Sequence, residues 1–428
     1  MALTLLVVSL VVMVILGAPI GIAMAAVPAI YIWATGELPL SAVPYQMFEA
    51  VAMPPLLAIP FFILTAELMN SGQITARLLT LARELVGRIR GGLAQMNIVG
   101  SMMFASISGS AVADVAAIGG VLIPAMRKEG YPGPLSAALT AMGSTMGGIL
   151  PPSILLVILA STMGISIGSV FAAGVLPGMC VGAILMGMVY VLALRQKWGR
   201  YKVPFTFTAL LKAIQGAWGA LLIPAIIAGG IISGVFTAAE AGAVAALLAL
   251  LLGTVVYRTL TPRALLGALT RAVKVASSVF IIIAASGPLS WLLNRIGALE
   301  GLQGFLLQFS HSPILFSLVL VGLVLVIGTL LEPVPAVVML GPTLVHVCVQ
   351  AGFHEIQAAI LLATGFILGS VTPPVGICYF TAAAIGGEKV DDVARAIIPF
   401  LAADVVVMFI VLLVPAMTLA LPRLLGLI

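Results

Sequence analysis

The feature that most constrains this chain is a series of apolar segments of bilayer-spanning length that recurs along almost all of its 428 residues. A helix of about 20 apolar residues crosses the hydrocarbon core of a membrane. The alternating pattern of a membrane β-barrel is absent, and lipid tolerates no unpaired backbone, so we expect an all-α integral membrane protein. Its spanning segments lie at about 2–34, 48–70, 134–160, 168–194, 216–235, 237–257, 274–293, 356–383 and 393–422.

Composition excludes several other classes of protein. With 62% hydrophobic residues, 8% charged residues and a mean hydropathy of +1.27, the chain does not resemble a water-soluble domain. The three cysteines stand singly, without metal or disulfide spacing. No phosphate-binding GxxxxGK[ST] sequence is present, so the energy for any transport comes from an ion gradient or from another chain.

The distribution of basic residues predicts the topology. With the N-terminus inside, the spans above place all but two of the 19 Lys and Arg residues on one face, leaving Arg295 and Arg423 opposite. That face is cytoplasmic by the positive-inside rule, and its charges are read as orientation anchors with no role in nucleic-acid binding. The N-terminal apolar run has no basic segment before it, and we interpret it as a retained first helix.

Two apolar stretches, 93–126 and 314–350, must enter and leave on the same side for this count to hold. Each is broken near its middle, the first by SISGS and the second by GTLLEPVP. They are predicted to be re-entrant helical hairpins, because irregular backbone at membrane depth survives only against protein or a water-filled cavity. The alternative is that Ser106 and Ser110 form a seam of small residues for helix packing.

An internal repeat favours the binding-site interpretation. A shift of 222 positions superimposes Gly130-Tyr131 on Gly352-Phe353, Gly143 on Gly365, Gly147 on Gly369, Pro177 on Pro399, and one Pro-Pro pair on another at 151–152 and 373–374. Each repeat carries a broken hairpin and a helix interrupted by Gly-x-x-x-Pro-Pro. In the predicted topology the two repeats are inverted, which is the pattern of secondary transporters whose site lies between discontinuous helices.

The breaks suggest cation sites. Proline removes an amide donor, so GGILPPS at 147–153 and GSVTPPV at 369–375 each leave carbonyls without helical partners. Such oxygens suit a hard monovalent cation, and helix N-termini suit an anion. We therefore expect two sodium sites beside an organic-anion site, with the hairpin tips supplying Ser106, Ser108, Gly109 and Ser110 in one half and Gly328 and Thr329 in the other.

Among the carboxylates in apolar surroundings, three are considered as site candidates: Asp114, Glu332 and Glu240. Asp114 could cap or support the first hairpin tip, and support is favoured over direct ligation. Glu332 could do the same in the second half. Glu240 could simply cap a helix through Thr237, which is the slightly favoured reading.

At this point the residues resemble a known family. SISGSAVADVAAIGGVLIPAMRKEGY at 106–131, STMGGILPPSI at 144–154, GTLLEPVPAVVMLGP at 328–342 and GSVTPPVGICYF at 369–380 are similar to the large membrane subunit of tripartite ATP-independent periplasmic (TRAP) transporters. The resemblance covers nearly the whole chain. Departures are the first break, GGILPP, where many members have another residue after the first glycine, and Ala363-Thr364-Gly365, where asparagine is frequent.

The resemblance implies a sodium-driven elevator transporter of the bacterial inner membrane, with a cytoplasmic N-terminus and a periplasmic C-terminus. Its implied partners are a separately encoded small four-helix membrane subunit, a periplasmic binding protein, membrane lipid and a small organic anion such as a dicarboxylate or sugar acid. The first sodium site would fall on Ser106, Ser108, Gly109, Gly147 and Pro151. The second would fall on Gly328, Gly369, Thr372 and Pro373, and the candidates for binding substrate or supporting a ligand are Ser110, Asp114, Thr329 and Glu332.

The expected domain plan follows the repeat. Scaffold helices occupy 1–72 and 195–293, and a basic amphipathic segment at 73–92 is an interfacial arm with a counterpart at 294–313. Transport elements occupy 93–194 (hairpin 93–126, broken helix 134–160) and 314–422 (hairpin 314–350, broken helix 356–383).

Three functions other than coupled uptake are alternatives for a chain of this composition. A stand-alone carrier, coupled to sodium or protons, would need no binding protein. An intramembrane enzyme would need convergent acid, base or metal groups, but Asp114 and Glu332 belong to opposite halves. A purely structural membrane protein would leave the repeated helix breaks unexplained.

Overall fold

The computed structural model describes residues 6, 8–10, 12–13, 16–196, 198 and 206–428, and regular structure in this part of the chain is entirely helical. Eight of the described helices are long and apolar enough to cross a membrane. The expectation of an all-α multi-pass membrane protein is therefore confirmed. Large apolar side chains stay exposed on the outside, among them Trp33, Leu16 and Phe48, as a lipid-facing surface requires.

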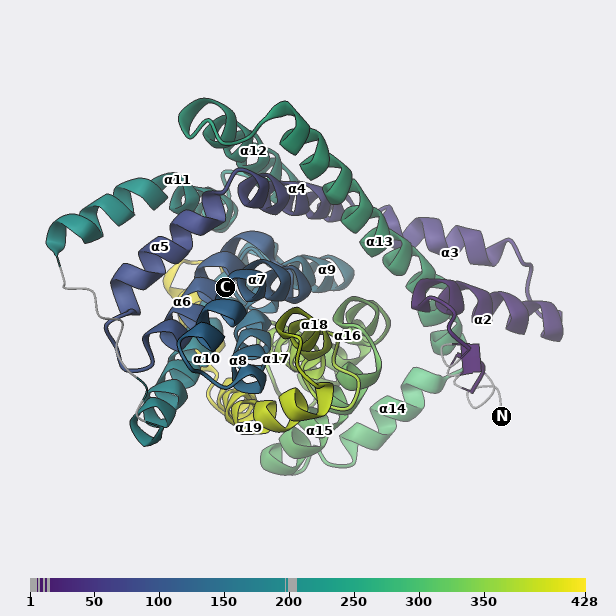
Figure 1. Ribbon diagram of the computed structural model, residues 1–428. Helices are drawn as coiled ribbons and strands as arrows, with labels where there is room; N and C mark the ends of the chain where they lie inside the picture. Colours follow the sequence, from purple (N-terminus) through teal and green to yellow (C-terminus); the bar gives the residue numbers. More distant parts are fainter. Residues whose placement is uncertain (1–5, 7, 11, 14–15, 197, 199–205) are drawn as a thin grey trace.

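The helices form an inner block and an outer frame that curves around it (Figure 1). In the frame, α4 packs on α12 and α13, α5 packs on α11, and α13 also contacts α2 and α3. The frame comprises α2 (Ile20–Thr35), α3 (Ala42–Val51), α4 (Ala58–Ser71), α5 (Ile74–Val86), α11 (Phe207–Ile232), α12 (Ala238–Leu251), α13 (Pro262–Arg295) and α14 (Ala298–Leu307).

The inner block contains the two predicted hairpins and both broken helices, packed around a continuous apolar core. Its first half comprises α6 (Gly92–Ser108), α7 (Ala111–Lys128), α8 (Gly133–Ser144), η2 (Thr145–Gly148), α9 (Ile154–Met163) and α10 (Ile167–Arg195). Its second half comprises α15 (Pro313–Leu330), α16 (Pro333–Gln350), α17 (Glu355–Gly369), α18 (Ile377–Gly386), α19 (Val390–Leu413) and α20 (Ala416–Leu424).

Helix boundaries repeat with the same shift of 222 positions that relates the sequence landmarks. Shifted by 222, α7 gives the bounds of α16 and α6 falls within one residue of α15. The starts of α9 and α10 fall within one residue of those of α18 and α19. Some of the local signals recur in both halves: Gly130 and Gly352, both with positive φ, follow the ends of α7 and α16, and a Pro-Pro pair precedes both α9 and α18.

Besides 216–235, which starts earlier because α11 begins at Phe207, four predicted spans have different bounds in the structure, and proline explains three of these four. The run 2–34 is interrupted, because α2 begins only after Pro19; residues 1–5, 7, 11, 14 and 15 lie outside the described part. The run 48–70 is divided by η1 (Pro54–Leu57). The run 393–422 is two helices, because Pro415 separates α19 from α20.

The fourth difference is at 274–293, which forms only the second part of α13. This helix is 34 residues long, and Thr261 caps its start by accepting a hydrogen bond from the backbone amide of Ala264 at 3.2 Å. Its first part carries Arg263 and Arg271, so hydropathy alone did not include it. Arg271 forms an ion pair with Glu67 of α4 at 2.8 Å, which ties the two frame helices together.

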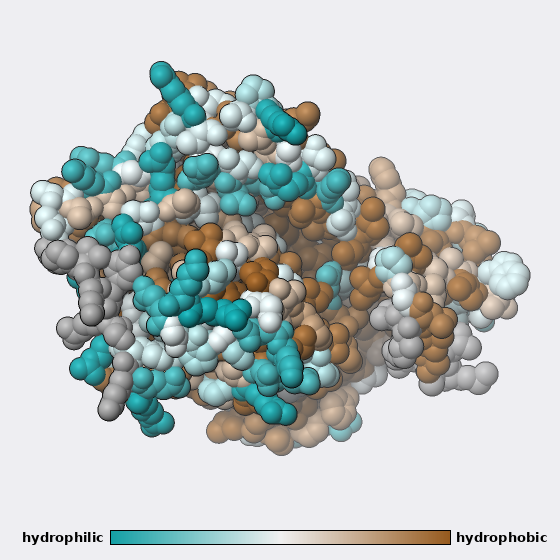
Figure 2. Space-filling view, in the orientation of Figure 1, coloured by the Kyte–Doolittle hydropathy of each residue, from teal (hydrophilic) through white to brown (hydrophobic). Residues whose placement is uncertain are grey.

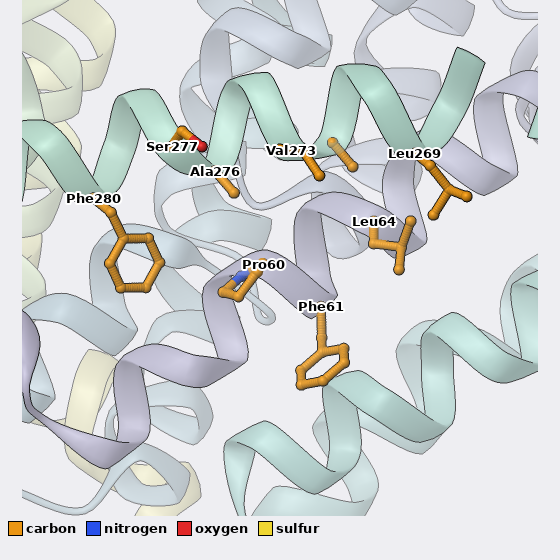
Figure 3. A pocket seen from close by; sticks show the side chains of 9 residues that line it. Pro60, Phe61, Leu64, Leu269, Val273, Ala276, Ser277 and Phe280 are labelled. Carbon is orange, nitrogen blue, oxygen red and sulfur yellow. The ribbon is translucent and has the colours of Figure 1, made fainter. Parts of the chain in front are cut away.

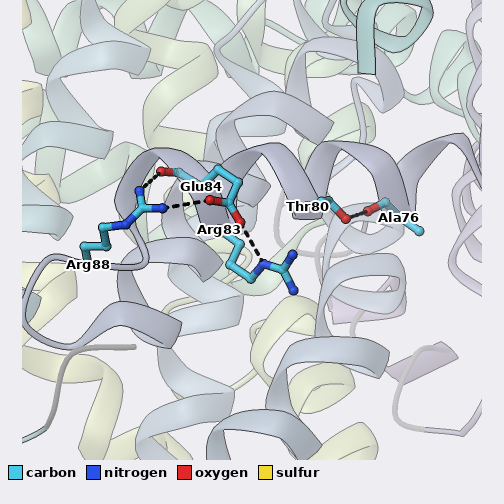
Figure 4. Close-up of polar contacts among 5 residues, drawn as sticks. All are labelled: Ala76, Thr80, Arg83, Glu84 and Arg88. Carbon is cyan, nitrogen blue, oxygen red and sulfur yellow. Dashed lines mark hydrogen bonds and ion pairs between the residues drawn. The ribbon is translucent and has the colours of Figure 1, made fainter. Parts of the chain in front are cut away.

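The basic segment predicted as an arm forms α5, whose buried side contacts α6 and α11. Figure 4 shows Glu84 between two arginines of the same segment. Its carboxylate lies 2.8 Å from Arg88 and 3.4 Å from Arg83, and its side chain is only 7% exposed. The ion pairs thus compensate the buried carboxylate within the C-terminal part of this segment.

The hydropathy of the surface is uneven, as expected for a membrane protein. Figure 2 shows hydrophilic side chains spread over the viewed face, with hydrophobic side chains gathered around α2 and α3 and along the lower rim. A groove of about 320 Å³ lies between α4 and α13, and Figure 3 shows Phe61, Leu64 and Phe280 among its side chains. Ser277 is its one polar side chain, so the groove suits hydrocarbon and offers no recognition for an organic anion.

Candidate functional site

The first hairpin tip docks directly on the first helix break. α6 ends at Gly109, which adopts a left-handed conformation with φ +61°. The Gly109 carbonyl accepts a hydrogen bond from the Ile154 amide at 3.3 Å, at the start of α9. A Cβ at Gly109 would lie 2.8 Å from the Pro152 carbonyl oxygen, so both the backbone angle and the space require glycine here.

Asp114 contacts both the first hairpin tip, at Ser108, and the first helix break, at Gly147. Its side chain is 1% exposed, and one carboxylate oxygen accepts a hydrogen bond from the Ser108 hydroxyl. The other oxygen, Oδ2, has no hydrogen-bond partner among the described residues. It lies over Gly147, where an added Cβ would stand only 2.4 Å from it.

The structure thus brings Ser108, Gly109, Asp114 and Gly147 together in the first half. The Ser106 hydroxyl instead donates to the Met102 carbonyl, one turn back in α6. An oxygen left without a partner beside a close-packed glycine is an arrangement that a sodium ion fits. The Ser108 hydroxyl, the Asp114 carboxylate and the carbonyls of the break are oxygens of the kind that a hard cation takes, so the residues present suit the predicted cation.

The second half is held by backbone contact. A Cβ on Gly369 would lie 2.2 Å from the Gly328 carbonyl carbon and 2.6 Å from its oxygen, so the end of α15 touches the end of α17 directly. The Thr372 hydroxyl donates to the Leu368 carbonyl at 2.7 Å within the break. The Pro373-Pro374 bond is cis, as is Pro151-Pro152 in the first half. The oxygens that a cation would find here are those of the backbone and of Thr372.

A pocket of about 350 Å³ lies where both hairpin tips, both breaks and α13 meet. The first residues of α7, α9, α16 and α18 all line it, so four helix N-termini converge on one cavity. A helix N-terminus presents unpaired amides and a positive partial charge. The polar side chains of the lining are Ser110, Ser278, Glu332 and Ser370.

Of the candidates predicted to bind substrate, Ser110 and Glu332 line this pocket. They are equivalent in the repeat, since 110 and 332 differ by 222, and each precedes the first turn of its helix. Asp114 is not in the lining. Thr329 is also outside it, and its hydroxyl donates to the Val326 carbonyl at 2.7 Å.

Sequence reasoning missed three polar residues of the inner region. Ser278 of the frame and Ser370 of the second break line the pocket. Asp404 in α19 is completely buried, and neither of its carboxylate oxygens has a hydrogen-bond partner among the described residues. The sequence does contain a signal for this residue, because Asp404 is the one carboxylate inside the apolar run 393–422.

The favoured prediction for Glu240, that it caps a helix through Thr237, is confirmed. Thr237 and Glu240 form a reciprocal capping box at the start of α12, with the Thr237 amide donating to the Glu240 carboxylate at 2.8 Å. The carboxylate stabilises a helix end and is not needed for a ligand.

The comparisons with known proteins decide the family. The model for "Tripartite ATP-independent periplasmic transporter, DctM component" matches residues 7–417. The chain belongs to this family. It is 33% identical over 409 residues to the sialic acid TRAP transporter large permease protein of Vibrio cholerae, covering 95% of each chain. It is 34% identical over 366 residues to the C4-dicarboxylate TRAP transporter large permease protein of Pseudomonas aeruginosa, covering 86% of each.

Among solved structures, the YdaH transporter of Alcanivorax borkumensis is similar in fold, with a TM-score of 0.64, 12% sequence identity and coverage of 87% of each chain. TRAP large permeases are transporters and not enzymes, so the intramembrane-enzyme reading is excluded. The family implies a small membrane subunit and a periplasmic binding protein as partners, and a location in the bacterial inner membrane.

Proposed function

We propose that this permease imports a small organic anion together with sodium, by an elevator movement of the inner block against the frame. The observation that carries the proposal is the meeting of two hairpin tips and two helix breaks at one pocket. A pocket surrounded by four helix N-termini attracts an anion, while oxygen-rich breaks on either side attract cations.

The substrate class follows from the pocket. Positive partial charge at the four N-termini favours a carboxylate, although the Ile154 amide is bonded to Gly109 and Pro333 has no N–H; no Lys or Arg lines the cavity. The volume of about 350 Å³ suits a small organic acid. Relatives whose names specify sialic acid and C4-dicarboxylates support a carboxylate or sugar acid as the cargo of this chain.

Sodium would be held at two places. In the first, the Asp114 carboxylate, the Ser108 hydroxyl and the backbone at Gly109, Gly147 and Pro151 are the candidate ligands, with Ser106 one turn away. When bound, sodium supplies positive charge that offsets the buried carboxylate and the anionic cargo. The chain's own contribution is to fix these oxygens at tips that contact the breaks directly.

The second place involves the backbone at Gly328, Gly369 and Pro373 and the Thr372 hydroxyl. This set contains no carboxylate. Its ligands come from two chain segments, α15 and the break after α17, so cation binding would strengthen the contact between hairpin and broken helix.

The elevator movement is supported by where the pocket walls come from. One wall belongs to α13 of the frame, through Val275, Ser278, Val279 and Ile282, and the other walls belong to the inner block. If the inner block moved past α13, the part of the pocket lining that belongs to the two hairpin tips would move with it, while the wall formed by α13 would stay in place. We propose that the basic face is cytoplasmic, with the N-terminus inside and the C-terminus periplasmic.

Thermal unfolding of the purified permease with its small partner subunit, in sodium and in potassium at equal ionic strength, tests the cation sites without knowledge of the cargo. A ligand that binds only the folded state raises apparent stability. We expect selective stabilisation by sodium that is reduced in Ser108→Leu and in Thr372→Leu.

Thr270→Leu is the matched control for the second site, because the Thr270 hydroxyl makes the same type of bond, to the Leu266 carbonyl at 2.8 Å, on the exposed side of α13. It should respond to sodium as the wild type does. Equal stabilisation by sodium and potassium would count against the sodium sites. Uptake into proteoliposomes without a binding protein would favour the stand-alone carrier.

A further inference from the structure

The buried carboxylate of Asp404 is used by neither sodium site nor the pocket. Asp404 lies 14 residues after the start of α19 and nine before its end, about 21 Å and 14 Å along the helix axis. It therefore stands deep within a helix long enough to span the membrane. On the same face of α19, buried Phe400, Val407 and Met408 surround it.

No charged group compensates this carboxylate within the described residues. Asp404 is 0% exposed, forms none of the ion pairs, and has no hydrogen-bond partner at either oxygen. An ionised carboxylate in such surroundings is too costly to be populated without a partner. The side chain must therefore carry a proton or bind a cation.

The helices packed against α19 are α8, α10, α15, α17, α18 and α20. α8 and α15 carry no titratable residue. The titratable residues of the others, together with those of α19 itself, are Cys180, Tyr190, Arg195, Glu355, Cys378, Tyr379, Arg423, Asp391, Asp392 and Arg395. Within the described residues, none of these groups forms an ion pair or a hydrogen bond with Asp404.

This neighbourhood fits a proton and does not fit a metal ion. A hard cation needs several oxygen ligands. Unlike the two broken helices, α19 is continuous around Asp404, so the neighbouring carbonyls are held in helical hydrogen bonds and do not supply them. A proton needs only the one carboxylate.

We propose that Asp404 is a proton-binding site, loaded in this conformation and separate from both sodium sites. The reaction is simple: the neutral acid gives its proton to water and leaves a carboxylate, and the reverse reaction reloads it. Release requires water to reach the carboxylate between α19 and the helices packed against it. Any step that separates these helices would therefore release the proton, and their closure would recapture it.

The site breaks the repeat, which is why it is distinct from the paired sodium sites. The position equivalent to Asp404 is Gly182 of α10, where an added Cβ would lie 2.5 Å from the sulfur of Met102. A side chain there would require Met102 to move. The first half therefore has no counterpart of the carboxylate, and the inferred site is single.

Infrared spectroscopy of the purified permease with its small subunit tests the proposal, because protonated and ionised carboxyl groups absorb at separate frequencies. At pH 7 we expect a protonated-carboxyl band in the wild type that is lost in Asp404→Asn. Asp392→Asn, an exposed change of the same chemistry on the same helix, should retain it. The band should persist to pH 8 and be unchanged when potassium replaces sodium.

Identical protonated-carboxyl bands in wild type and Asp404→Asn would overturn the proposal. A difference that appears instead as ionised carboxylate, or that follows the sodium concentration, would assign Asp404 to a metal cation and also overturn it. If Asp404→Asn does not fold, Asp404→Glu gives the answer, because a protonated glutamate shifts the band and does not remove it; an unshifted band contradicts the proposal. None of these results depends on sodium-coupled import.

Discussion

The contact between Gly147 and Asp114 gives the sharpest test of the first sodium site. A Cβ introduced by Gly147→Ala would lie 2.4 Å from Asp114 Oδ2 and 3.4 Å from the Ala111 amide nitrogen. Ordinary non-bonded contact begins near 3.5 Å, so the carboxylate must withdraw by about 1 Å. That movement takes the oxygen without a partner away from the place where a cation would sit.

The size of the effect follows from what the withdrawal removes. A hydrogen bond or ligand contact to a charged group contributes about 1.5–3 kcal/mol. Since each 1.4 kcal/mol is a factor of ten in a binding constant, sodium should bind about 10- to 140-fold more weakly. Ser108, which donates to the same carboxylate, should lose its bond as well.

The assay is a sodium titration of the unfolding temperature, in which the concentration that gives half of the stabilisation is compared between variants. Gly120→Ala is the control, because it lies in α7 near Asp114 and an added Cβ there meets nothing within 4 Å. We expect the midpoint to rise in Gly147→Ala only. A wild-type midpoint in Gly147→Ala would refute the reasoning, whatever the absolute stability of the variant.

Three further variants probe other parts of the molecule. Ser278→Leu occupies part of the pocket from the exposed side of α13, so uptake should fall while the sodium response stays intact. Gly109→Ala should lower the unfolding temperature, because the left-handed backbone costs about 1–2 kcal/mol and the Cβ meets Pro152. Glu84→Gln should cost about 1 kcal/mol by removing the ion pairs of α5, measured by the same unfolding assay.

The parts of the fold that sequence predicted are those set by local chemistry. The hairpin expected at 93–126 is formed by helices at 92–108 and 111–128, because SISGS contains the one residue that tolerates the turn, Gly109. The break within 134–160 was predictable because Pro151 and Pro152 cannot continue a helix. Pro415 is an equally local signal for the end of a helix, but the length of the apolar run 393–422 favoured a single span.

The parts that sequence did not predict depend on long-range packing. Which side chains line the pocket depends on how α13 passes the hairpin tips, and nothing in the sequence around Ser278 reports that. In the sequence, Asp404 is the one carboxylate of its apolar run. Reasoning from the repeat favours residues that coincide in both halves, and the residue equivalent to Asp404 is Gly182. Burial and the absence of a partner among the described residues single it out only in the folded chain.

The repeat also predicts that the two sodium sites differ in strength. The position equivalent to Asp114 is Ala336, so the first site has a carboxylate and the second relies on backbone oxygens and Thr372. A full negative charge binds a cation more tightly than dipoles of neutral groups in the same surroundings. A sodium titration should therefore show two steps, with Ser108→Leu weakening the tighter step and Thr372→Leu the weaker one. A single step that both variants weaken equally would mean that the sites load together, and that the contact between the two halves of the inner block outweighs their difference in ligands.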